Sequence, residues 1–203
     1  MSNRHTKKRL FCLFALFVLL SQFTSGCIEI RRTDSPETMS AMQAKDIVDE
    51  YIQWDDNYTV SHIRKGGMVS EDGESECWFV VYSLKGNIGE MVDTIEYKVY
   101  IDDVIEIPRS KSKYVGDVTI NWSIDSPEAL AIARNNEHIS EWLSKYKRAT
   151  IETMSFGLNR EISPDPIWGI HWSYSGGIFG DPVHAEIIIN ARNGEVIEVD
   201  ADI

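Results

Sequence analysis

An internal repeat constrains this chain more than any other feature of its sequence. Asp34-Ser35-Pro36-Glu37 recurs as Asp125-Ser126-Pro127-Glu128, and Trp78 matches Trp168 in nearly the same register. The same register aligns further positions: Val48 with Ile139, Tyr51 with Trp142, Ile52 with Leu143, Val60 with Ile151, Ile63 with Met154, Tyr82 with Trp172, Gly86 with Gly176 and Ile88 with Ile178. A register kept over about seventy residues is typical of duplication, so the sequence predicts two copies of one small unit.

Each copy has the pattern of one helix followed by four strands. Ser-Pro-Glu in each tetrapeptide supplies a capping serine, a proline at the first helical position and a glutamate at the positive helix end. We therefore expect helices to begin after Ser35 and Ser126, the second one interrupted near Asn135-Asn136. Alternating apolar residues predict strands: Tyr58 to Arg64, Thr150 to Phe156, Ile167 to Tyr174, His184 to Ala191 and Val196 to Val199. This order predicts an α+β fold of two repeated modules, each one helix packed on a four-stranded antiparallel sheet.

The N-terminus has the pattern of an export signal. A basic start precedes eleven apolar residues from Leu10 to Leu20, too few for a bilayer-spanning helix of about 20 residues. Thr24-Ser25-Gly26-Cys27 resembles a prokaryotic lipobox, with Thr24 where Leu is commonest. We expect a lipoprotein signal peptide over residues 1–26 and lipidation of Cys27. Secretion without a lipid and an uncleaved signal anchor remain alternatives.

The remaining boundaries follow from the repeat and the leader. We expect a tether over residues 27–40, a first module over 41–110 and a second over 125–203. Lipid attachment would hold both modules at the extracytoplasmic face of the cell membrane or envelope.

The charge balance limits the classes of partner. The chain has 20 Lys and Arg against 32 Asp and Glu, and four of the basic residues lie in the first ten positions. The part that follows the leader therefore carries 16 basic and 32 acidic residues, a net charge of −16. Such a charge argues against nucleic acid and against docking on anionic lipid through a basic patch. It favours a cationic protein partner, with membrane contact through the lipid anchor.

Two segments of the second copy resemble a known family. Ser126-Pro127-Glu128-Ala129-Leu130-Ala131-Ile132-Ala133 resembles the opening helix of a PepSY domain. The segment Ile187 to Ile197 resembles its closing hairpin, although Asn190 stands where the family typically has Asp. The resemblance covers Ser126 to Ile203, and the first copy only through the repeat. It implies a non-catalytic module of the kind found in propeptides of secreted metallopeptidases and in envelope proteins, where inhibition or chaperoning of peptidases has been proposed.

Motifs for catalysis are missing from the sequence. It contains no phosphate-binding Gly-Lys-Ser/Thr loop, no Gly-x-Ser-x-Gly elbow and no His-Glu-x-x-His pair. We therefore predict no enzymatic activity and no cofactor. The function we expect is binding of an envelope or secreted protein or peptide, such as a secreted peptidase, through an exposed sheet edge. An envelope sensor that binds a metal or a small ligand is the alternative.

Several residue groups are candidates for that alternative. His171, His184 and Glu186 lie on consecutive predicted strands and alternate away from the apolar face, and two imidazoles and a carboxylate suit a divalent metal. The first copy has Val81 and Thr94 at the aligned places, which favours ordinary solvated residues. Two acidic segments, Glu71 to Glu76 and Glu198 to Asp202, are expected to be solvated.

The aromatic residues and the one cysteine outside the leader region favour structural roles. The aromatic residues at strand spacing form either a binding stripe or the core beneath the helix, and the core is favoured: Trp78, Tyr82, Trp168, Trp172 and Tyr174. Cys77 stands in an apolar run and is expected to be a buried, inert thiol.

Overall fold

The computed structural model describes residues 37–52, 57–120, 122–175 and 181–202. Residues Glu37–Ile203 form one compact unit, separate from Met1–Pro36, and this unit is described by itself. Its elements follow in this order: α2 (Ala41–Tyr51), β1 (Tyr58–Lys65), β2 (Trp78–Leu84), β3 (Met91–Val99), β4 (Val104–Lys113), α3 (Ser126–Asn135), α4 (Glu137–Lys145), β5 (Thr150–Gly157), β6 (Ile167–Tyr174), β7 (Val183–Asn190) and β8 (Val196–Ala201).

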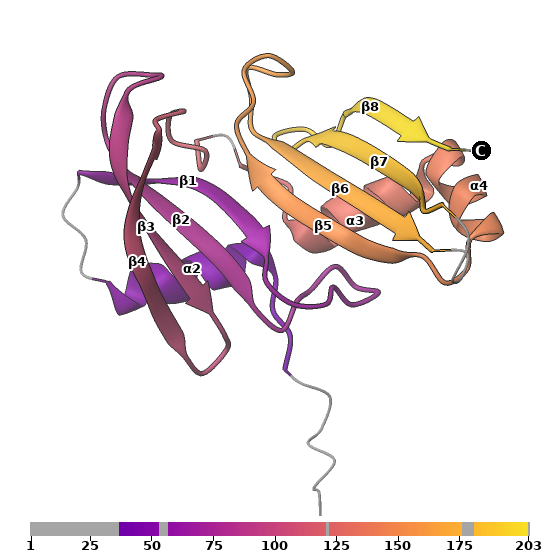
Figure 1. Ribbon diagram of the computed structural model, residues 1–203, viewed down its shortest axis with the longest axis horizontal. Coiled ribbons are helices and arrows are strands. Elements are labelled where there is room, and N and C mark those ends of the chain that lie inside the picture. Colours follow the sequence, from indigo (N-terminus) through magenta and orange to yellow (C-terminus); the bar gives the residue numbers. More distant parts are fainter. Residues whose placement is uncertain (1–36, 53–56, 121, 176–180, 203) are drawn as a thin grey trace, which may run out of the picture. The chain divides into compact units, whose positions relative to one another are not determined.

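The eight strands form a single antiparallel sheet in the order β4-β3-β2-β1-β5-β6-β7-β8 (Figure 1). The α+β class is therefore confirmed, but the two four-stranded sheets expected from the sequence are not separate. They join where β1 pairs with β5, with His62 opposite Gly157, Ile63 opposite Phe156 and Arg64 opposite Ser155. We call this pairing the seam. It forms because each of these strands would otherwise leave a row of unpaired backbone groups at a sheet edge.

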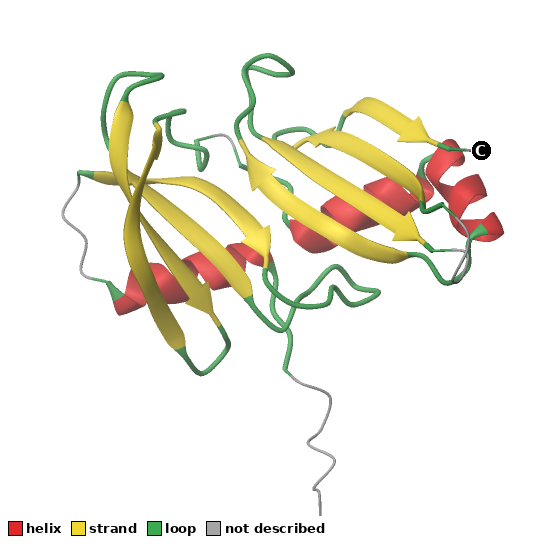
Figure 2. Ribbon diagram, viewed as in Figure 1, coloured by secondary structure: helices red, strands yellow, loops and turns green. Residues whose placement is uncertain are grey.

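The described helices pack against one face of the sheet (Figure 2). Helix α2 contacts β1, β2 and β3, whereas α3 and α4 contact β6, β7 and β8. The core under them is continuous across the seam, because buried Ile63 lies opposite both Val80 and Phe156. The opposite side of the sheet, which we call the open face, carries the side chains that alternate with this core.

The helices begin at other residues than expected. Helix α2 is capped by Ser40, whose hydroxyl accepts from the Gln43 N–H while the Gln43 side chain accepts from the Ser40 N–H. This capping box satisfies two helix N–H groups, so the start predicted after Ser35 is wrong. Ser35 itself lies outside the described residues. Helix α3 is capped by Asp125 rather than Ser126, and the predicted interruption is confirmed because Asn136 caps α4.

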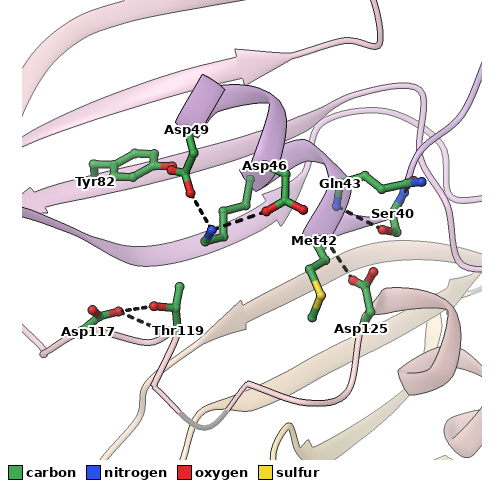
Figure 3. Close-up of polar contacts among 10 residues, drawn as sticks. Ser40, Met42, Gln43, Asp46, Asp49, Tyr82, Asp117, Thr119 and Asp125 are labelled. Carbon is green, nitrogen blue, oxygen red and sulfur yellow. Dashed lines mark hydrogen bonds and ion pairs between the residues drawn. The ribbon is translucent and has the colours of Figure 1, made fainter. Parts of the chain in front are cut away.

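The N-termini of α2 and α3 meet and share one carboxylate (Figure 3). Asp125 Oδ1 accepts from the Ser126 N–H at 2.6 Å and from the Met42 N–H at 3.0 Å. The Ser126 hydroxyl accepts from the Ala41 N–H at 3.0 Å, which explains why Ser126 does not cap its own helix. Two positive helix ends thus lie together, and the Asp125 carboxylate offsets both dipoles.

Two tryptophans fix the strands to the segments that lead into these helices. Trp78 Nε1 donates to the Met39 carbonyl at 2.9 Å, and Trp168 Nε1 donates to the Ile124 carbonyl at 2.7 Å. Both acceptors stand directly before a helix cap. Met39, which the sequence placed in the tether, is buried and exchanges backbone hydrogen bonds with Ser75 at 3.0 Å. Met39 therefore belongs to the folded unit, and residues 27–36 of the expected tether lie outside the described residues.

Candidate functional site

One row of side chains crosses the open face from β2 to β7. The strand registers place Phe79 opposite Arg64, Arg64 opposite Ser155, Ser155 opposite Gly169 and Gly169 opposite Ile188. Directly opposed residues of neighbouring strands project from the same face. The row therefore changes from large side chains on β2 and β1 to small ones on β5 and β6.

This change in side-chain size hollows the open face on one side of the seam. The Arg64 guanidinium lies 4.0 Å from the centre of the Phe79 ring and pairs with Glu96 at 2.6 Å. Ser155 and Gly169, on the other side of the seam, offer no comparable bulk. A groove of about 830 Å³ lies along the seam, lined by residues from both sides of it, and we call it the central groove. Its volume is within the range typical of sites that bind small molecules or peptide segments.

The central groove is walled by loops and carries charge of both signs. It is lined by residues of β1, the end of β4, β5, the loop that follows β5, β6 and β7: Ser61, His62, Arg64, Lys65, Gly66, Ser112, Lys113, Val115, Glu152, Thr153, Met154, Ser155, Phe156, Gly157, Leu158, Asn159, Ile162, Ile167, Gly169, Glu186 and Ile188. Burial, and then the positive charge of Arg64, lower the pKa of His62. Burial likewise lowers the pKa of Lys65. The groove therefore combines small residues at its floor with the charges of Arg64 and Lys113 and of Glu152 and Glu186, whereas burial disfavours the charged form of His62.

The two histidines predicted to lie together do so, but a different carboxylate is within reach of them. The His171 and His184 rings stack with centroids 5.0 Å apart and an interplanar angle of 24°. Glu186 is opposite His171 in the sheet register, as expected. The carboxylate that contacts His171 is that of Glu152, with Oε2 3.4 Å from Nδ1.

A β-bulge explains why sequence reasoning missed Glu152. Met154 and Phe156 face the core, so strict alternation along β5 predicts Glu152 on the helix side. The register shifts between Ile151 and Thr153, and the extra residue of such a bulge re-aims its side chain. Glu152 is exposed and is brought to the histidines on the open face. Local alternation carries no signal for this irregularity.

The aromatic and thiol predictions for the core are confirmed. Trp78, Tyr82, Trp168 and Trp172 are buried, and Tyr174 is partly buried against the same core. Cys77 is a buried free thiol as predicted, and burial raises its pKa, which disfavours the thiolate; its inertness stays a prediction.

The acidic loop between β1 and β2 has contacts of its own. Glu74 accepts from the Thr38 hydroxyl at 2.6 Å, and the Glu71 carbonyl accepts from Arg134 at 2.7 Å. Gly73 has a φ of +83° and packs directly against Pro127, where a Cβ would lie 2.7 Å from the proline Cα. These contacts hold the loop against both ends of α3 and against the segment that leads into α2, so the loop, expected to be simply solvated, has a structural role.

The carboxylates near the C-terminus face the open side of the sheet. Asp200 is directly opposite Glu186, and Glu198 is directly opposite Ile188. The Asp202 carboxylate accepts from the His184 N–H at 3.3 Å. The alternation predicted for these residues therefore places negative charge beside the two histidines.

Comparison with known proteins adds no relative. No protein-family model matches the chain, and neither a curated protein nor a solved structure matches it. The resemblance to PepSY domains therefore stays a prediction. Among the described residues, no helix has the length and apolar character required to cross a membrane.

Proposed function

We propose that this chain is a lipid-anchored, non-catalytic protein of the extracytoplasmic face of the cell envelope. We further propose that it binds a segment of another envelope or secreted protein, such as a secreted peptidase, in the central groove. The observation that carries the proposal is the hollow on the open face, where Ser155 and Gly169 stand in place of bulky side chains.

The small residues of the groove suit an extended main chain. Side chains at Ser155, Gly157 and Gly169 are too small to keep a peptide backbone away from the sheet. Arg64, Lys65 and Lys113 on one side and Glu152 and Glu186 on the other offer partners for charges along a bound segment.

The outer sheet edges are less suited to binding than the sequence suggested. Strand β4 carries Pro108 at a register irregularity opposite β3, and lysines at Lys111 and Lys113. Proline and lysine on an edge strand are devices that discourage pairing with another chain. Strand β8 is short, and Glu198 and Asp200 place charge on it. For this reason the groove, and not an edge, is the binding surface in this proposal.

The fold supports an origin by duplication of one helix-and-four-strand module. The bulge between Val60 and His62 in β1 lies opposite Tyr82 and Val81, just as the bulge in β5 lies opposite Trp172 and His171. Arg64 and Ser155, which the sequence register treats as equivalent, are directly paired at the seam. Direct pairing of residues that are equivalent in the two copies is the kind of self-complementary contact found in a symmetric dimer.

Localisation rests on the leader alone. The apolar run from Leu10 to Leu20 and the segment Ser25-Gly26-Cys27 support export and lipidation, and all of them lie outside the described residues. A lipid at Cys27 would tether the folded unit to the membrane.

A metal- or ligand-binding sensor is the second candidate function. One observation favours it: Glu152, His171 and His184 bring together ligand atoms within 4.8 Å of one another. This cluster lies on β5, β6 and β7, and Glu152 also lines the groove.

The proposal is tested by filling the groove. A Cβ added at Gly169 meets nothing nearer than Ser155 Oγ at 3.7 Å, so the backbone position accepts a side chain, and Gly169→Phe adds bulk to the groove floor. Thr150→Phe, on an exposed β5 position outside the groove, is the matched control. The full chain and both variants are offered secreted proteins of the source cells at low and high salt.

We expect the chain and Thr150→Phe to retain the same partner, and Gly169→Phe to lose it. Retention should weaken at high salt, because a chain of net negative charge attracts a basic partner electrostatically. Equal retention by all three proteins would exclude the groove as the binding surface. Absence of any retained partner, with stoichiometric binding of a metal or small ligand, would favour the sensor.

A further inference from the structure

Three neighbouring strands each supply one metal-binding side chain to the same spot on the open face. Glu152 comes from the bulge in β5, His171 from β6 and His184 from β7. His171 and His184 are diagonal neighbours, since His171 is opposite Glu186 and His184 is opposite Ser173. Residues in this relation are still close enough for their side chains to meet.

The distances are near those of a coordination site. One potential ligand atom from each residue lies within 4.8 Å of the other two. Bonds of 2.0–2.1 Å to a tetrahedral ion place ligand atoms roughly 3.3 Å apart. Glu152 Oε2 and His171 Nδ1 are already 3.4 Å apart. The other pairs are at most 4.8 Å apart, and Glu152 has an exposed side chain that is free to move toward the two rings.

The surroundings of the histidines favour a cation. His184 Nδ1 is buried and has no hydrogen-bond partner among the described residues. This nitrogen is therefore available to coordinate a cation. Glu186 and Asp200 are directly opposite each other, an arrangement of like charges that destabilises a sheet unless a cation offsets it. Asp202 adds a third carboxylate next to His184.

The other half of the sheet shows that the fold does not require these residues. Ser61 occupies the equivalent bulge position in β1, where its hydroxyl donates to the Val81 carbonyl at 3.1 Å. Val81 stands opposite this bulge as His171 stands opposite Glu152. Thr94 is opposite Ser83 as His184 is opposite Ser173, and its hydroxyl hydrogen-bonds with Ser110 at 2.8 Å. Ser61, Val81 and Thr94 occupy these three positions in the first half and do not form a metal-binding set. The glutamate and the two histidines are therefore specific to the second half.

We infer that Glu152, His171 and His184 form a binding site for a divalent transition-metal ion of the Zn²⁺ class. Two imidazoles and one carboxylate are ligands that Zn²⁺ accepts, and three protein ligands leave a coordination position for water or a bound group. The carboxylates of Glu186, Asp200 and Asp202 raise the local concentration of cations. This inference goes beyond the peptide-binding proposal and does not depend on it.

The test titrates the purified full chain with Zn²⁺ by calorimetry and with Co²⁺ by visible absorption. His171→Val and His184→Thr introduce the residues that the other half tolerates, and Glu152→Gln changes an exposed side chain, so all three should fold. His138→Ala, on the exposed side of α4, is the matched control. Because thiolates also bind these metals, the comparison is between variants that all keep the three cysteines. Thiolate-bound Co²⁺ is recognised by its intense charge-transfer band.

We expect one equivalent of Zn²⁺ to bind the chain and His138→Ala equally. Loss of either histidine should weaken binding by at least about 10- to 100-fold, and Glu152→Gln by about 10-fold. The Co²⁺ spectrum of this site should lack the thiolate band. Absence of stoichiometric binding would overturn the inference, and so would unchanged affinity in His171→Val and His184→Thr. Partner retention by these variants is measured separately, so failure of the metal site leaves the groove proposal intact.

Discussion

Replacement of Trp78 and Trp168 by Phe tests whether the two halves share one core. Each substitution removes a buried indole N–H that donates to a carbonyl before a helix cap. Each carbonyl keeps another donor, the Ser75 N–H for Met39 and Trp122 Nε1 for Ile124, so the lost hydrogen bond costs about 1 kcal/mol. The three heavy atoms removed from the core cost about 2 kcal/mol more. We therefore expect about 3 kcal/mol of destabilisation from each substitution.

The double variant distinguishes a shared core from independent modules. The two rings contact each other edge to face, with centroids 6.3 Å apart, although they belong to β2 and β6. Pairs of this kind are coupled by about 0.5–1.5 kcal/mol, so the two effects should deviate from additivity by that amount. Urea unfolding followed by far-UV circular dichroism should show one transition for every variant. Two transitions, each moved by only one of the substitutions, would refute the shared core.

Three further predictions concern the helix ends, a buried phenol and the anchor. Asp125→Ala removes the carboxylate shared by two helix N-termini and should lower the free energy of unfolding by about 2 kcal/mol in urea titrations. The control Asp46→Ala, at an exposed site, should change this free energy by under about 0.5 kcal/mol. Burial, and then the hydrogen bond to Asp49, raise the pKa of Tyr82. Because the phenol of the unfolded chain ionises first, the free energy of unfolding should fall above about pH 10. Tyr82→Phe should lessen this loss in thermal melts from about pH 9 to 11, and an unchanged dependence of stability on pH would contradict the assignment. Cys27→Ser should release the protein from membranes or block its processing, and equal membrane retention with an uncut leader in both proteins would indicate a signal anchor instead.

The strands were largely predictable, because alternation along each strand reflects one buried and one open face. Ile167 to Tyr174 was expected and observed with the same bounds, since Trp168, Ile170 and Trp172 all point into the core. The start of α2 was mistaken because a repeated tetrapeptide was followed in place of a local signal. That signal was present: Ser40 and Gln43 have the spacing of a capping box.

The seam and the groove could not be read from the sequence. Pairing of Arg64 with Ser155 joins residues far apart in the chain, and local periodicity contains no information about it. The groove depends on which side chains meet across that pairing, so it follows from the same long-range contact. Placing Glu152 beside the histidines would have required prediction of the bulge in β5, because a bulge reverses the face that alternation predicts for the side chain.

Site-specific photocrosslinking on intact source cells tests the central claim, that the groove holds another protein. A photoreactive phenylalanine analogue is placed at Val115, a loop residue that borders the groove without filling its floor, and at Thr150 outside the groove in a parallel strain. After irradiation, adducts are separated by mass and the attached protein is identified by mass spectrometry. The account predicts one dominant protein adduct from position 115 and none from position 150. No adduct from position 115, or the same adducts from both positions, would contradict it.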